Sequence, residues 1–278
     1  MFYRYKDTRL YYEVIGEGKP VLLLHGLACD MNLMKGCMEP VFKHRSGYKR
    51  IYVDLPGMGQ SDAHFDFATA DKIIEVLSAF SEERIEENFL LVGESYGGYL
   101  CRGLLGRQLD RVDGFMLICP VVVPQTKMRQ LPEKNLMFGD EEHLNTLKES
   151  SRTAFCEYAV IADERTYRRH RQEIVVGLKR ANYEFIDELR KNYHFEEDFN
   201  GSIRNKTFHN PTLFVCGRQD NCVGYRDLWT LLEDYPRATF GVLDVAGHNM
   251  QIEQPELFES LTKNWLDRVE TFKKVDVL

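Results

Sequence analysis

The stretch that decides the fold is FLLVGESYGG, residues 89–98. Its first half is an apolar run that predicts a buried strand, and the residues that follow, 99–105, predict a helix. The pattern G-x-S-x-G stands between them and is typical of a sharp strand-to-helix turn that lifts a serine hydroxyl above a sheet. Gly93 and Gly97 lie two residues either side of Ser95, where the arms of such a turn come close together. An ordinary glycine-rich turn has the same local pattern, so the rest of the chain must supply chemical partners for the serine.

The chain before this turn predicts strands and one helix. Apolar segments of strand length lie at residues 2–5, 10–15, 21–24 and 50–54. A turn at 6–9 joins the first two segments, so we expect an antiparallel hairpin. Apolar residues over 70–80 recur at helical spacing. The polar region between 28 and 49 is assigned no element.

The chain after the turn continues this alternation, with one long interruption. Further strands are predicted at residues 112–119, 211–216 and 239–245, and a helix begins at Pro255. Residues 124–206 are mostly charged and aromatic, show helical character over 157–191, and contain no convincing buried strand. We therefore expect one α/β core domain, residues 1–123 and 207–278, with a helical cap or lid inserted at 124–206.

A serine nucleophile needs a base and an acid that orients the base. His248 directly follows the last predicted strand, and Asp220 comes just past the strand that ends at Cys216. Catalytic groups of open α/β sheets collect at the carboxyl ends of the strands. The order Ser95, Asp220, His248 is the chain order of a hydrolase triad. Other roles stay open, because an aspartate can cap a helix and a loop histidine can bond to backbone.

An oxyanion hole is expected from backbone N–H groups on two loops. We nominate the N–H of Tyr96, which follows the nucleophile, and the N–H of Leu27, which follows His25-Gly26. His25 is expected to brace this loop rather than act as a base. Glu94 adjoins the nucleophile, but its side chain is expected to leave in a different direction. The residues expected to contact substrate are Leu27, Tyr96, Val121 and Asn249.

Five segments together resemble the α/β-hydrolase family over nearly the whole chain. They are HGLACD (25–30), DLPGMGQSD (54–62), GESYGG (93–98), GRQD (217–220) and AGHNMQIEQPELF (246–258). The resemblance implies the α/β-hydrolase fold, a mostly parallel twisted sheet with covering helices. It also implies the triad and oxyanion roles given above, a cap over the pocket, and an architectural role for Asp54. Cys29 stands where the family's common H-G-x-x-G loop has its second glycine.

Composition excludes several classes of partner. The chain has 278 residues and a net charge of −7, so phosphate backbones and anionic lipid surfaces are poor partners. No apolar stretch reaches the length of a membrane helix, and the charged N-terminus does not resemble a signal peptide. Seven scattered cysteines without a C-x-x-C pair favour free thiols in the cytoplasm. No metal-ligand spacing and no cofactor motif is found, and the oligomeric state is not predicted.

The residues therefore predict a cofactor-independent serine hydrolase acting on a small-molecule acyl substrate, with a carboxylic ester as the default. An acyltransferase, an amidase or aminopeptidase, and a carbon–carbon bond hydrolase would use the same site. A ligand receptor on the same fold is the alternative outside enzymes. Specificity is expected in the insertion, where apolar residues either line a pocket or form the insertion's own core. These residues are Met137, Phe138, Phe155, Tyr158 and Tyr183.

Overall fold

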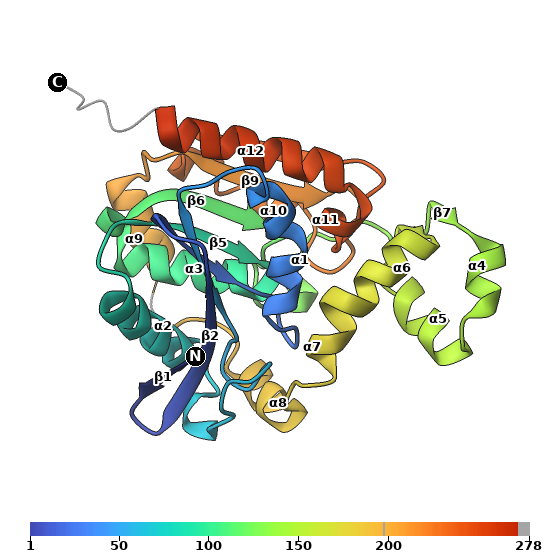
Figure 1. Cartoon of the computed structure of the whole chain (residues 1–278), viewed down its shortest axis with the longest axis horizontal. Coiled ribbons are helices and arrows are strands. Elements are labelled where there is room, and N and C mark those ends of the chain that lie inside the picture. Colours follow the sequence, from blue (N-terminus) through green and yellow to red (C-terminus); the bar gives the residue numbers. More distant parts are fainter. Residues whose placement is uncertain (197, 272–278) are drawn as a thin grey trace.

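An eight-stranded sheet forms the centre of the computed structural model, which describes residues 1–196 and 198–271 (Figure 1). Along the sheet the strands run in the order β1-β2-β4-β3-β5-β6-β9-β10. The two N-terminal strands are antiparallel to each other, and β2 is antiparallel to β4, while the remaining pairs are parallel. The strands are β1 (Phe2–Tyr5), β2 (Thr8–Ile15), β3 (Lys19–Leu24), β4 (Tyr48–Val53), β5 (Phe89–Glu94), β6 (Val112–Ile118), β9 (Thr212–Gly217) and β10 (Ala238–Leu243).

The register of the parallel strands brings their carboxyl ends to one edge. Leu24 of β3 pairs with Gly93 of β5, and Ile118 of β6 pairs with Val215 of β9. Gly217 at the end of β9 pairs with Leu243 at the end of β10. The loops that carry Leu27, Ser95, Asp220 and His248 therefore leave the sheet along the same edge, although they are far apart in sequence.

Helices cover both faces of the sheet. Helices α1 and α12 pack together on one face, and α2, α3 and α9 lie on the other (Figure 1). The bounds of the main covering helices are α1 (Met31–Phe42), α2 (Ala70–Arg84), α3 (Ser95–Arg107), α9 (Phe199–Lys206), α10 (Arg226–Trp229), α11 (Met250–Glu253) and α12 (Pro255–Thr271). Trp265 of α12 is fully buried, and its indole N–H donates to the Pro211 carbonyl at 3.0 Å.

Helix α1 lies in the region to which the sequence assigned no element. Asp30 caps it by accepting from the Asn32 N–H at 3.0 Å, and its inner face buries Met34, Cys37 and Met38. Methionine and cysteine give a weak apolar pattern, and Pro40 inside the helix looks like a breaker. Burial against the sheet, rather than local propensity, stabilises this helix.

The segment 124–206 is more varied than the expected helical insertion. It contains a two-stranded parallel sheet that the sequence did not indicate. Its elements are β7 (Phe138–Gly139), α4 (Glu141–Thr146), α5 (Glu149–Cys156), β8 (Ile161–Ala162), α6 (Glu164–His170), a π-helical turn (Arg171–Val175), α7 (Val176–Leu178), α8 (Tyr183–Lys191) and α9. Figure 1 shows α4, α5 and β7 projecting away from the main sheet, whereas α8 buries Phe185, Ile186 and Leu189 in the main core.

Most of the aromatic and apolar side chains expected to line or fill this segment are on its surface. Phe155 is buried in a small separate core with Leu144, Ala159 and Ala162. Met137, Phe138, Tyr158 and Tyr183 are each at least 40% exposed, so they form neither a closed core nor an enclosed pocket in this state.

Candidate active site

Ser95 is the first residue of α3 and has a φ of +51°, in the left-handed region that residues with a Cβ rarely adopt. The surrounding glycines make this conformation possible. A Cβ at Gly97 would lie 2.3 Å from the Leu24 carbonyl oxygen, and one at Gly93 would lie 2.6 Å from the Gly97 carbonyl oxygen. The expected close approach of the two arms around the serine is confirmed, and it explains why only glycine fits at these positions.

The structure brings the three predicted polar residues together. His248 Nε2 lies 3.0 Å from Ser95 Oγ, and His248 Nδ1 lies 3.0 Å from Asp220 Oδ2. Asp220 is fully buried, and its other oxygen accepts from the N–H groups of Cys222 at 2.8 Å and Val223 at 3.0 Å. Asp220 therefore braces its own turn and contacts the histidine at the same time.

Burial and charge act in opposite directions on this pair. Burial raises the pKa of Asp220. His248 and the two backbone N–H groups lower the pKa by more than burial raises it, so the pKa lies below the usual value. Burial lowers the pKa of His248, whereas Cys222 and Asp220 raise it to well above the usual value. Asp220 is thus ionised at neutral pH and favours a proton on the imidazole.

Glu94 does not leave the site as the sequence analysis expected. Its side chain is buried, and its Oε1 lies 3.5 Å from His248 Nε2. Burial raises the pKa of Glu94 to about 7, against the lowering effect of His248. The space for its carboxylate comes from Gly26, where a Cβ would lie 2.3 Å from Glu94 Oε2. A second carboxyl group therefore stands beside the histidine.

The loop after β3 lies directly against Ser95. A Cβ at Gly26 would be 3.1 Å from Ser95 Cβ, and the half-buried Leu27 follows it. Tyr96 is the second residue of α3, so its N–H belongs to the first turn, where backbone donors have no partner within the helix. Val121 is buried, and its N–H donates to the Ser95 carbonyl at 3.0 Å.

Asn249, the remaining residue expected to contact substrate, caps α11. Its carbonyl accepts from the N–H groups of Ile252 at 2.8 Å and Glu253 at 3.1 Å. Its described hydrogen bonds thus belong to the start of a helix, and its half-buried side chain stands next to His248 in sequence. The position of Asn249 supports a structural role more directly than a substrate contact.

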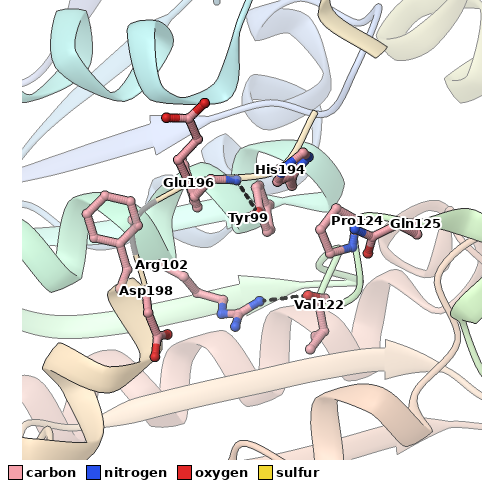
Figure 2. Close-up of a pocket in the computed structure, with 11 residues that line it drawn as sticks. Tyr99, Arg102, Val122, Pro124, Gln125, His194, Glu196 and Asp198 are labelled. Carbon is pink, nitrogen blue, oxygen red and sulfur yellow. Dashed lines mark hydrogen bonds between the residues drawn. The ribbon is translucent and has the colours of Figure 1, made fainter. Parts of the chain in front are cut away.

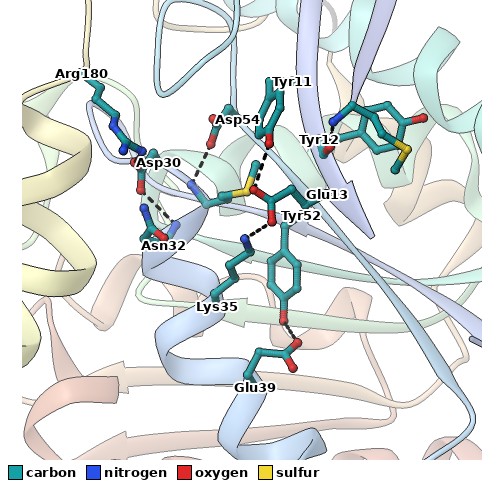
Figure 3. A network of polar contacts seen from close by, with 12 residues as sticks. Tyr11, Tyr12, Glu13, Asp30, Asn32, Lys35, Glu39, Tyr52, Asp54 and Arg180 are labelled. Atoms are coloured by element: carbon teal, nitrogen blue, oxygen red, sulfur yellow. Dashed lines mark hydrogen bonds and ion pairs between the residues drawn. The ribbon is translucent and has the colours of Figure 1, made fainter. Parts of the chain in front are cut away.

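Two buried groups hold the loop after β3 in place. His25 lies between the Gly26 carbonyl, 2.8 Å from Nδ1, and the Leu55 N–H, which donates to Nε2 at 3.0 Å. These contacts require a neutral ring with its proton on Nδ1, which confirms the expected bracing role. Asp54 accepts from the Met31 N–H at 2.9 Å (Figure 3). It also accepts from the Gln60 N–H at 2.8 Å, as an architectural residue should.

The segment 124–206 contacts both loops of the site. A Cβ at Gly177 would lie 2.4 Å from the Asp30 nitrogen, next to the loop after β3. On the other side, a Cβ at Gly247 would lie 2.9 Å from the Val160 side chain. Figure 3 shows Arg180 reaching Asp30, with 3.1 Å between guanidinium and carboxylate. The segment is therefore held at both ends of the Ser95–His248 pair.

Aromatic stacking attaches the end of this segment to helix α3. The Tyr193 ring stacks on Tyr96 with 4.2 Å between centroids, and Phe195 stacks on Tyr99 at 4.5 Å. The Phe195 N–H also donates to the Tyr99 hydroxyl at 2.8 Å. A pocket of about 310 Å³ beside this contact includes Tyr99, Arg102 and His194 and is not lined by Ser95, Asp220 or His248 (Figure 2).

Two further arrangements of side chains at the site were not predicted from the sequence. Glu253 is buried in α11, and its carboxylate accepts from the N–H groups of Val160 at 2.6 Å and Gly247 at 2.6 Å. Cys119 Sγ, Asp220 and His248 bring ligand atoms within 4.8 Å of one another. Asp220 and His248 already bond each other through Oδ2 and Nδ1, so this group is not assigned as a set of metal ligands. Nothing local in the sequence signals either arrangement.

Comparison with known proteins identifies the family of the chain. Residues 19–255 match the family described as alpha/beta hydrolase fold, and the chain belongs to this family. The predicted fold is thereby confirmed. Among the described residues, no helix is long and apolar enough to cross a membrane.

Three similar proteins illustrate the range of the family. A 2-hydroxy-6-oxononadienedioate/2-hydroxy-6-oxononatrienedioate hydrolase of Comamonas testosteroni is 24% identical, covering 94% of this chain and 92% of the relative. The AB hydrolase superfamily protein YisY of Bacillus subtilis is 30% identical, but the match covers only 46% of this chain and 47% of YisY. A crystal structure of an alpha/beta superfamily hydrolase from Oenococcus oeni PSU-1 has a TM-score of 0.87 and 27% identity, covering 98% of this chain and all of that one.

Proposed function

We propose that the protein is a serine hydrolase that cleaves a small-molecule carboxylic ester. The observation that carries the proposal is the continuous chain of contacts from Ser95 Oγ through both nitrogens of His248 to Asp220, each 3.0 Å long. Such a chain can move a proton away from the serine as its oxygen attacks.

In the proposed reaction, Ser95 attacks the acyl carbon while His248 Nε2 accepts the hydroxyl proton. Asp220 keeps the imidazole in the tautomer with its proton on Nδ1 and stabilises the imidazolium that forms. The N–H groups of Leu27 and Tyr96 stabilise the oxyanion, and each such donor typically contributes about 2.7–4 kcal/mol to catalysis. His248 then protonates the leaving alcohol, and water releases the acyl group by the reverse sequence of transfers.

We further propose that residues 124–206 act as the cap that decides which substrates reach Ser95. Contacts of Gly177 and Val160 with loops on either side of the site support this role. All seven cysteines are free, which favours a reducing compartment such as the cytoplasm. We assign no cofactor to this reaction, because the proposed steps use only side chains and backbone of the chain itself.

A carbon–carbon bond hydrolase is the second candidate. The specific observation in its favour is the Comamonas relative, which aligns over 94% of this chain. The name of that relative gives its substrates as 2-hydroxy-6-oxononadienedioate and 2-hydroxy-6-oxononatrienedioate. That reaction also needs a serine, a histidine and an oxyanion hole, so the site does not separate the two. Turnover of a dienedioate but not of short esters would favour this candidate.

The test is labelling with a fluorophosphonate together with turnover of short-chain nitrophenyl esters. We expect wild type to label and to turn over, and Ser95→Ala to do neither. Ser150→Ala, on the exposed side of α5, is the matched control and should behave as wild type. If wild type neither labels nor turns over while Ser95→Ala binds a ligand as well as wild type, the protein is a receptor. Faster transfer to an added alcohol than to water would indicate an acyltransferase.

A further inference from the structure

Glu94 is a buried carboxyl group at the reacting end of the histidine. Its Oε1 lies 3.5 Å from His248 Nε2, which is the nitrogen that also contacts Ser95 Oγ at 3.0 Å. Although Glu94 occupies the N-cap position of α3, its side chain makes no capping hydrogen bond. Its side chain instead projects toward Gly26, the residue before Leu27, where the absence of a Cβ makes room for it.

The groups around Glu94 determine its pKa. Burial raises the pKa of Glu94, His248 lowers it, Asp220 raises it, and a backbone hydrogen bond from Gly26 lowers it. Burial outweighs these effects and brings the pKa to about 7. Glu94 also acts on the buried groups Cys29, Cys37, Cys119 and Tyr193. In the part of the chain that the structure describes, His248 is the cationic group that acts on Glu94 and lies 3.5 Å from it, so it is the partner with which Glu94 can exchange a proton.

We propose that Glu94 shares a proton with His248 and holds it as a neutral carboxylic acid while Ser95 attacks. In the resting site the proton lies on Nε2, opposite an ionised Glu94, and Nε2 then has no lone pair for the serine. Transfer of that proton from Nε2 to Glu94 Oε1 leaves the total charge unchanged and frees Nε2 to accept the Ser95 proton.

The same transfer serves the oxyanion hole. Glu94 Oε2 lies beside Gly26, so an ionised Glu94 would repel negative charge forming at the Leu27 N–H. A neutral Glu94 removes this repulsion at the moment when the oxyanion forms. This inference rests on the proposed hydrolase function for its catalytic meaning, but the shared proton itself is a property of the resting protein.

The test is an NMR titration of the His248 ring in wild type and in Glu94→Gln, which keeps the volume of the side chain and removes its charge. An ionised Glu94 favours the imidazolium, so its loss should lower the His248 midpoint, by about one pH unit or more. Glu39→Gln is the control, because it loses an ion pair with Arg50 far from the site. It should lower the melting temperature and leave the His248 midpoint unchanged.

An unchanged His248 midpoint in folded Glu94→Gln would overturn the proposal. So would an equal shift in Glu39→Gln, since the change would then follow from general destabilisation. The titration needs no substrate and therefore separates the two hypotheses. If wild type hydrolyses no ester but the midpoint still falls in Glu94→Gln, the shared proton stands and the proposed function fails.

Discussion

Replacing Gly97 by alanine tests whether backbone packing at the turn positions the nucleophile. The new Cβ would lie 2.3 Å from the Leu24 carbonyl oxygen and 2.5 Å from that of His25, whereas real Cβ contacts are almost never below 3.0 Å. Both atoms belong to the backbone of β3 and its loop, so neither can rotate away. The turn must therefore move by at least 0.7 Å, the difference between 3.0 and 2.3 Å.

This displacement has two measurable consequences. If it is directed away from His248, the Ser95–His248 distance grows from 3.0 Å to about 3.7 Å, beyond a useful hydrogen bond. A misplacement of about 1 Å can lower the rate about 100-fold. Overpacking costs about 1–3 kcal/mol, partly offset by up to about 1 kcal/mol of helix propensity. The net loss of up to about 2 kcal/mol corresponds to a melting temperature lower by roughly 4–8 °C.

The assay pairs ester hydrolysis with thermal unfolding of Gly97→Ala. Gly139→Ala is the control, because its nearest neighbour would be 3.5 Å away, an ordinary contact distance. We expect the control to keep both wild-type activity and stability. If Gly97→Ala hydrolyses esters within about threefold of wild type, the geometric reasoning is wrong, since a tenfold rate change already corresponds to only about 1.36 kcal/mol.

Three other predictions concern buried groups. The two carboxylate oxygens of Glu253 accept separately from the Val160 and Gly247 N–H groups. Glu253→Gln replaces one of these oxygens by an NH2 donor and should lower the free energy of unfolding by about 1–3 kcal/mol, measured by urea denaturation. Asp54→Asn places an amide against a backbone donor and should cost a similar amount in the same experiment. Burial lowers the pKa of His170 to about 4 from 6.5, so its neutral form stabilises the fold above pH 6.5 and this contribution is lost as pH falls toward 4. His170→Phe should therefore lose less stability over that pH range. A urea midpoint that falls with decreasing pH as much in His170→Phe as in wild type would contradict this.

Local sequence patterns predicted much of the architecture. The apolar runs and breakers placed all eight strands of the main sheet within about two residues, and β2, β3 and β4 were each predicted to start two residues late. This was possible because strands that are buried on both faces appear in the sequence as nearly continuous apolar runs. Helix α1 was missed because Met34, Cys37 and Met38 form a weak pattern and Pro40 resembles a break. Its stability comes from packing against strands remote in sequence.

By itself, the sequence determined the α/β-hydrolase fold, the sharp turn at Ser95 and the strand ends that carry Asp220 and His248. Each of these depends on residues close together in the chain. Only the tertiary structure decided that the three side chains meet at 3.0 Å and that Glu94 turns toward His248. The direction of Glu94 depends on the space left by Gly26, a residue 68 positions earlier that reaches it only because β3 pairs with β5. A strand pattern shows where a loop begins, whereas contacts between loops follow from the register of the whole sheet.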